Sequence, residues 1–80
     1  MADLRQALVH MREGRWNEAH ILVQSDESAL AAWLHGILHV QEGDLGNAEY
    51  WYGQAARDFG SRGTLEEEMA RFEAELPAKM

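Results

Sequence analysis

The chain has no cysteine and a single proline among its 80 residues. Without cysteine, both a disulfide framework and a thiolate metal site are excluded. No apolar run approaches the roughly 20 residues that a membrane-spanning helix needs. Residues 1–5 lack the basic segment and the uninterrupted apolar run of a signal peptide. We therefore expect a cytoplasmic protein with no membrane partner.

Positive charge is scarce, because one lysine and six arginines stand against fourteen acidic residues, for a net charge of −7. This field repels phosphate backbones and anionic membrane surfaces, so we predict no nucleic-acid partner. The chain is nevertheless 46% hydrophobic and contains three tryptophans, which is typical of a folded protein. Its length predicts one domain, 1–80, whose small core a partner subunit can help to stabilise.

An internal repeat at an offset of 29 residues is the most informative pattern that is present. The segment 10–19, HMREGRWNEA, recurs at 39–48 as HVQEGDLGNA, with His, Glu, Gly and Ala in register. In each copy the glycine stands between two apolar helical stretches. Each copy therefore predicts a helix, a tight turn and a second helix.

Apolar periodicity predicts five helices, over about 3–13, 16–24, 27–42, 45–59 and 64–76. No strand pattern is present. The predicted class is all-α, with two antiparallel αα-hairpins at about 3–25 and 27–59 and a C-terminal helix at about 64–76. The expected helix-end residues are Asp3, Gly14, Ser25 or Asp26, Gly43, Asp44 and Thr64. Gly36 lies inside the third helix at a cost of about 1 kcal/mol, so we expect another helix to cross closely over it.

Small and aromatic residues at fixed places in the hairpins resemble those of tetratricopeptide repeats. They are Gly36, Gly43, Ala48, Tyr52 and Ala55 in the second hairpin, and Ala7, Gly14, Trp16, Ala19 and Val23 in the first. The offset is shorter than the family's period of about 34 residues. The segment 42–52 is also similar to one found in small uncharacterised bacterial proteins. The repeat family implies a scaffold that binds proteins or peptides, so we expect a non-catalytic interaction module.

The resemblance implies that the apolar stripe of the third helix lines a concave groove. That area is too large to stay exposed on a monomer. Either the helix at 64–76 folds across it, or a second copy packs there; we favour a homodimer. The candidate interface residues are Leu30, Trp33, Leu34, Ile37, Val40 and Trp51.

Four histidines suggest a second kind of function. His35 and His39 are four residues apart and share a helix face, a spacing that can chelate a metal. Glu42 lies one turn further on, and the repeat can bring His10 nearby, so the candidate ligands are His35, His39 and His10. We expect these imidazoles to fill aromatic positions, with no metal or cofactor bound, and His20 to stand alone and exposed. The alternative is a metal- or small-ligand-binding helical protein, and a weaker one is an enzyme with a shallow site near these histidines.

No catalytic residue is predicted. The glutamates at 66–68 lie at the favourable end of a helix dipole, which indicates a solvated face. The serines and Thr64 stand where caps and turns need hydroxyls, without a neighbouring histidine and acid to activate them. The sequence therefore says more about architecture than about chemistry.

Overall fold

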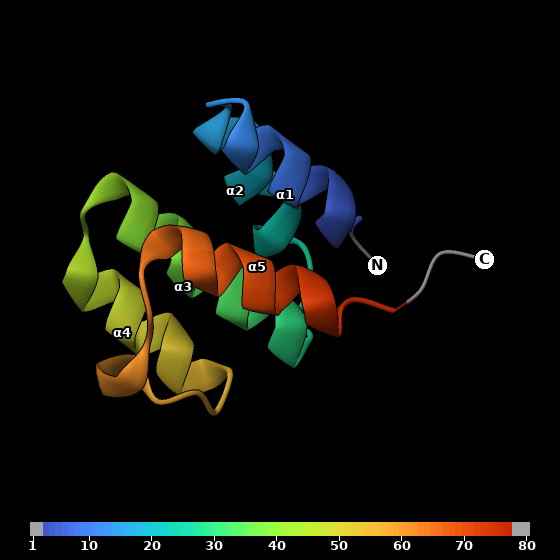
Figure 1. Cartoon of the computed structure of the whole chain (residues 1–80). Helices are drawn as coiled ribbons and strands as arrows, with labels where there is room; N and C mark the ends of the chain where they lie inside the picture. The colour runs from blue at the N-terminus through green and yellow to red at the C-terminus, as the bar shows by residue number, and fades with distance from the viewer. Residues whose placement is uncertain (1–2, 78–80) are drawn as a thin grey trace.

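The computed structural model describes residues 3–77. Over this range the chain folds into five α-helices and one 3-10 turn (Figure 1). They are α1 (Leu4–Arg12), α2 (Trp16–Gln24), α3 (Ala29–Glu42), α4 (Leu45–Gln54), the 3-10 turn η1 (Phe59–Ser61) and α5 (Leu65–Glu75). Within this range there is no strand, so the predicted all-α class is confirmed. None of the described helices is long and apolar enough to cross a bilayer.

Side-chain caps begin most of the helices where the sequence predicts them. The side chains of Asp3, Asp44 and Thr64 each accept a backbone N–H from the first turn of the helix that follows. The start of α3 differs from the prediction, because Ser28 caps it. Asp26 instead accepts the backbone N–H of Ser28 at 2.8 Å, which closes a turn before the helix. The helix therefore starts two residues later than we predicted.

The end of α4 was predicted wrongly, since the helix stops at Gln54 and not near Phe59. Ala56 adopts a left-handed backbone with φ of 58°, and the N–H of Arg57 returns to the carbonyl of Tyr52 at 2.9 Å. These are features of a Schellman-type helix end. The position is normally glycine, and alanine there costs about 1–2 kcal/mol. The sequence therefore carries no local sign of this end.

The two predicted hairpins are compatible with the contacts, in which α1 packs on α2 and α3 on α4. A Cβ atom added to Gly36 of α3 would lie 2.5 Å from Cδ1 of Tyr52 and 3.2 Å from the carbonyl oxygen of Ala48. The predicted close crossing at Gly36 is thus confirmed, and α4 is the helix that crosses.

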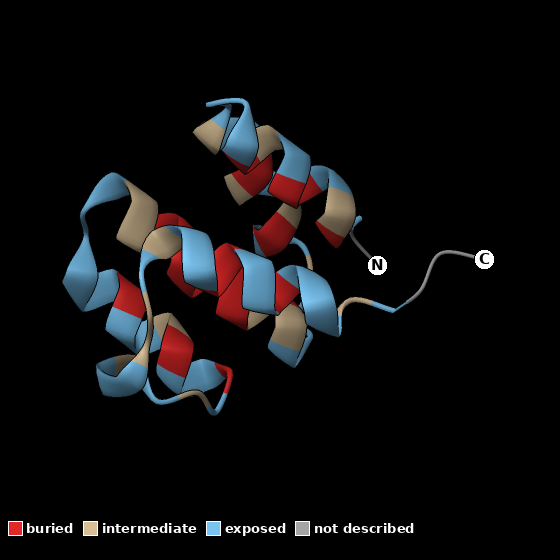
Figure 2. Ribbon diagram, in the orientation of Figure 1, coloured by how far each residue is buried: buried red, intermediate tan, exposed pale blue. Residues whose placement is uncertain are grey.

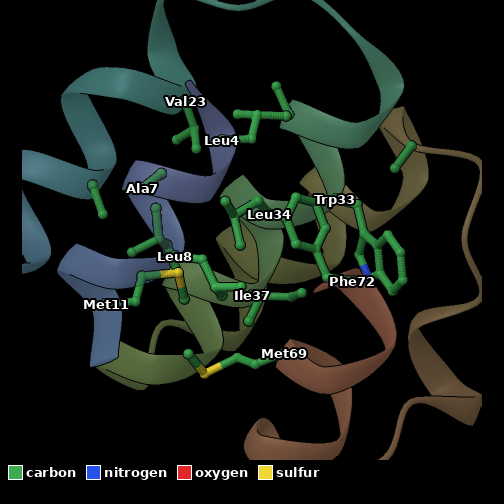
Figure 3. Packing of buried hydrophobic residues seen from close by; sticks show 14 of the residues in the cluster. Leu4, Ala7, Leu8, Met11, Val23, Trp33, Leu34, Ile37, Met69 and Phe72 are labelled. Atoms are coloured by element: carbon green, nitrogen blue, oxygen red, sulfur yellow. The ribbon is translucent and has the colours of Figure 1, made fainter. Parts of the chain in front are cut away.

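The fifth helix packs across α3 and covers its apolar stripe (Figure 1). Phe72 of α5 is fully buried, and its ring meets that of Trp33 edge to face at 5.4 Å between centroids (Figure 3). Trp33, Leu34 and Ile37 are each 2% exposed or less. In this conformation these three interface candidates are therefore core residues of the chain and offer no surface to a partner.

The other interface candidates are half-buried. Leu30 and Val40 pack at the edge of the core, and Trp51 lies against the ring of His35. In Figure 2 the buried residues of α3 and α5 face each other and the outward faces of both hairpins are exposed. The homodimer stays a prediction, but the exposed stripe that suggested it is absent from the described chain.

One glutamate of the predicted solvated face is in fact buried. Glu68 is 4% exposed and accepts hydrogen bonds from the Tyr52 hydroxyl at 2.7 Å, the Gly63 N–H at 3.2 Å and the Arg71 guanidinium at 2.8 Å. Burial by itself raises the pKa of Glu68, but the hydrogen bonds outweigh it and the pKa lies below its usual range. Glu68 thereby ties α4 to α5.

Candidate metal centre

Three histidines from two helices meet on the side of α3 that faces α2. His35 and His39 of α3 are 4% and 6% exposed, and His20 of α2 is half-buried. The Nε2 atoms of His20 and His35 are 3.0 Å apart. One ligand nitrogen from each of the three rings lies within 4.8 Å of the other two. We call His20, His35 and His39 the three-histidine cluster.

Local helix geometry explains the cluster. His35 and His39 are one turn apart on α3, so their side chains project from the same face. Trp16 and His20 have the same spacing on α2, and their rings stack at 4.6 Å between centroids. The Trp16 indole N–H donates to the carbonyl of Leu38 at 2.8 Å, which fixes this face of α2 against α3.

A third helix, α4, also contacts the three-histidine cluster. The indole ring of Trp51, from α4, stacks on His35 with centroids 3.9 Å apart and planes 9° apart. The opposite edge of the cluster is bounded by Trp16, whose ring lies 5.8 Å from that of His39. Two tryptophans therefore hold the imidazole planes in place.

Two imidazoles of the cluster, those of His35 and His20, have lowered pKa values. Burial, followed by the nearby charges of His20 and His39, lowers the pKa of His35 from 6.5 to about 4. Burial and then the charge of His39 also lower the pKa of His20, against a smaller opposite effect of Glu42. At neutral pH both rings are therefore neutral, which is the state of imidazole that binds metals.

Glu42 orients the third imidazole. Its carboxylate accepts a hydrogen bond from Nδ1 of His39 at 2.6 Å. Because Nδ1 is engaged with the carboxylate, Nε2 is the nitrogen of His39 that could bind a metal. A carboxylate that fixes the outer nitrogen of a ligating histidine is a recurrent second layer of protein metal sites.

The geometry of the cluster fits a tetrahedral transition-metal ion. Zinc–nitrogen bonds of about 2.0–2.1 Å place the ligand nitrogens of one ion roughly 3.3 Å apart. The 3.0 Å separation of His20 and His35 is close to that value, and His39 needs only a small side-chain movement. Three protein ligands leave a fourth position for water or another ligand.

A second group, His39, Glu42 and Asp44, also has its ligand atoms within 4.8 Å of one another. The Asp44 carboxylate, however, already accepts the backbone N–H of Asn47 at 3.2 Å and its side-chain amide at 3.0 Å. Binding a metal there would remove the N-cap of α4. The three-histidine cluster is the better candidate.

The structure corrects two predictions about the histidines. Nδ1 of His10 accepts a hydrogen bond from Nε of Arg15 at 2.9 Å, and His10 is outside the cluster. The third member is His20, which we had expected to stand alone and exposed. The sequence does contain a sign that His20 belongs to the cluster. A short turn joins α2 to α3, and His20 and His35 lie at similar distances from it, on either side.

Comparisons with known proteins add no assignment, since no family model, curated protein or solved structure matches the chain. The resemblance to tetratricopeptide repeats stays a prediction, as does that of 42–52 to small bacterial proteins.

Proposed function

We propose that the protein binds a divalent transition-metal ion through His20, His35 and His39. The observation that carries this proposal is the convergence of three imidazoles from two helices, with their ligand nitrogens within 4.8 Å of one another. Placing imidazoles in a largely buried position has a desolvation cost. Hydrogen bonds between His20 and His35 and between His39 and Glu42 offset part of that cost. A metal ion bonded to one nitrogen of each ring would replace the first of these bonds and satisfy all three imidazoles.

The chemistry of the ligands selects the class of metal. Imidazole nitrogen suits zinc, copper, nickel and cobalt, whereas magnesium and calcium prefer oxygen ligands. Imidazole binds a metal as an uncharged ligand, so the ion keeps its full positive charge. The net charge of −7 on the chain favours the approach and retention of a cation.

The proposal concerns binding, and no reaction is assigned to the ion. It adopts the alternative that the sequence left open, with His20 in the place of His10. A role in protein interaction, which the sequence favoured, stays a proposal, but the covered stripe of α3 no longer supports it.

Calorimetric titration of tag-free, metal-free protein with zinc tests the proposal. We expect one ion per chain, and a rise in thermal stability that grows with free zinc. At 100 times the dissociation constant, the stabilisation is about 2.7 kcal/mol. Failure of zinc, nickel and copper to bind at micromolar concentration would refute the proposal.

Two matched variants locate the ion. His20→Ala removes a ligand from the three-histidine cluster only, and should abolish binding. Asp44→Asn disables the second group but retains an N-cap, and should bind zinc as the native chain does. The reverse pattern would place the metal at His39, Glu42 and Asp44, and would contradict the proposed site.

Glu42→Gln tests the orienting role of the carboxylate. The amide cannot hold the His39 proton as the carboxylate does, so zinc affinity should fall about 10- to 100-fold. His10→Ala serves as the control, because its ring lies outside the cluster and its loss should leave the affinity unchanged. Equal affinity of the Glu42→Gln and native proteins would exclude this role.

A further inference from the structure

A groove of about 600 Å³ lies where the C-terminal ends of α2 and α4 meet the first turns of α3. Its walls are Gln24 of α2 and Trp51 and Gln54 of α4, and its floor includes Ala32 and His35 of α3. We call it the α2–α4 groove. Its volume lies within the range of about 300–1,000 Å³ typical of ligand sites in proteins.

The electrostatics of the groove favour a cation. Asp26 and Glu27 line it, and no lysine or arginine does so among the described residues. Gln24 and Gln54 are the last residues of α2 and α4, so the negative ends of two helix dipoles point at the groove. The positive end of α3 also lies here and offsets part of this effect.

The groove also offers an apolar surface beside these charges. Val23, Ala29 and Ala32 contribute aliphatic area, and Trp51 contributes an aromatic wall. The Trp51 indole is held by its stacking on His35, so little side-chain entropy is lost when a ligand binds. An aliphatic stem that ends in a positive charge matches this combination, because the stem contacts the apolar area and the charge meets the Glu27 carboxylate and the indole.

The apolar surface continues beyond the groove along α4. Tyr50 is 56% exposed, and its ring meets that of Trp51 at 5.1 Å between centroids. An exposed tyrosine in contact with a half-buried tryptophan is typical of surfaces that bind proteins. The extent of this surface exceeds what one small amine would cover.

We propose that the α2–α4 groove binds a basic segment of a partner protein, with one lysine or arginine side chain inserted between Trp51 and Glu27. This interaction surface is separate from the covered stripe of α3. It depends on charge complementarity and on the Trp51 wall, and not on a bound metal.

Titration of metal-free protein with an acetylated peptide of alternating lysine and alanine residues tests the proposal by calorimetry and tryptophan fluorescence. We expect saturable binding that weakens with added salt, and no binding of the matching glutamate–alanine peptide. Spermidine at the same concentration should not displace the peptide. Displacement by spermidine would identify a site for small amines, and absence of peptide binding at millimolar concentration would equally overturn the proposal.

Three exposed positions locate the binding surface without disturbing the core. Gln54→Lys adds a positive charge to the wall and should weaken peptide binding at least tenfold, roughly as expected for like charges in contact. Glu27→Gln should weaken it about threefold. Glu49→Gln makes the same change of charge on α4 outside the groove, and should leave affinity unchanged. Native affinity in Gln54→Lys, or equal losses in the two glutamate variants, would show that the peptide binds elsewhere.

Discussion

Two sides of α3 bury aromatic side chains in different ways. Towards α5, the indole of Trp33 meets the phenyl ring of Phe72 edge to face, next to the fully buried Ile37. Towards α2, the neighbouring His35 is 4% exposed but has imidazole and indole rings around it. The side chains on the two sides are buried to nearly the same extent. Burial of hydrocarbon area is favourable, however, whereas burial of imidazole nitrogens is unfavourable.

The α5 side of α3 stabilises the fold, whereas the α2 side carries the proposed metal site. On the α5 side, removal of apolar area from water is itself the source of stability. On the α2 side, burial lowers the pKa of His35 to about 4, which measures how unfavourable a charge is there. A polar cluster that is costly to bury is the stronger candidate for function.

The largest effect should come from the α5 side. Phe72→Ala removes a fully buried ring that covers Trp33, so we expect the free energy of unfolding to fall by about 3–5 kcal/mol. Ile21→Ala is the control, because Ile21 is 64% exposed and should change stability by less than about 0.5 kcal/mol. Urea unfolding measures both. Similar small changes in the two variants would mean that α5 does not cover α3 in solution.

The α2 side should respond to pH. In metal-free protein the pKa of His35 is about 4, whereas it is near 6.5 in the unfolded chain, so protons bind preferentially to the unfolded state. The stability that this difference contributes is complete above pH 6.5 and is lost as pH falls towards 4, by about 3 kcal/mol in all. Urea unfolding between pH 7 and pH 4 should show the loss, and His35→Gln should flatten the curve. An NMR titration of His35 with a midpoint near 6.5 would contradict this prediction.

A third side of α3, towards α4, can be tested at glycine. Gly36→Ala should lower stability by about 1–2 kcal/mol, because the new methyl meets the Tyr52 ring and overpacking outweighs the gain in helix propensity. The Tyr52 hydroxyl is held by Glu68, so the ring cannot move aside freely. Gly53→Ala, with no atom within 4 Å of the new Cβ, should instead raise stability by about 0.5–1 kcal/mol. Thermal unfolding measures both variants. A stability change of the same sign in both would show that α4 packs less closely on α3 than the structure has it.

The smallest effect should be the coupling between the two proposed sites. His35 belongs both to the three-histidine cluster and to the α2–α4 groove, so a zinc ion there places positive charge beside a groove that binds a cation. We expect saturating zinc to weaken binding of the lysine–alanine peptide by about tenfold or less, which is at most about 1.4 kcal/mol, and the peptide to weaken zinc binding by the same factor. Calorimetric titrations in both orders measure the two factors. Stronger peptide binding in the presence of zinc would contradict the placing of zinc and peptide on either side of His35.

Much of the fold could be predicted from local patterns in the sequence. The capping box at Thr64, the cap at Asp3 and the left-handed Gly43 each act within one turn of a helix, so neighbouring residues suffice to identify them. The early end of α4 could not be predicted. Its left-handed Ala56 is unfavourable locally, and the turn places Arg57 over the ring of Trp33 and beside Glu75 of α5.

The site was only half predictable for the same reason. The spacing of His35 and His39 is a property of one helix, and the sequence identified it. His20 reaches them only because α2 packs antiparallel on α3, and His10 is held elsewhere by Arg15. Repeat symmetry pointed to His10, but the packing of side chains between helices depends on distances that a repeat pattern does not contain.

The sequence by itself determined the all-α class, the helix-rich hairpins and the acidic character of the protein, since periodicity, end residues and composition act locally or additively. Only the tertiary structure decided that α5 covers the apolar stripe and that three histidines converge. Both outcomes depend on which helix faces pack together, and that choice is made by the burial of the whole chain at once.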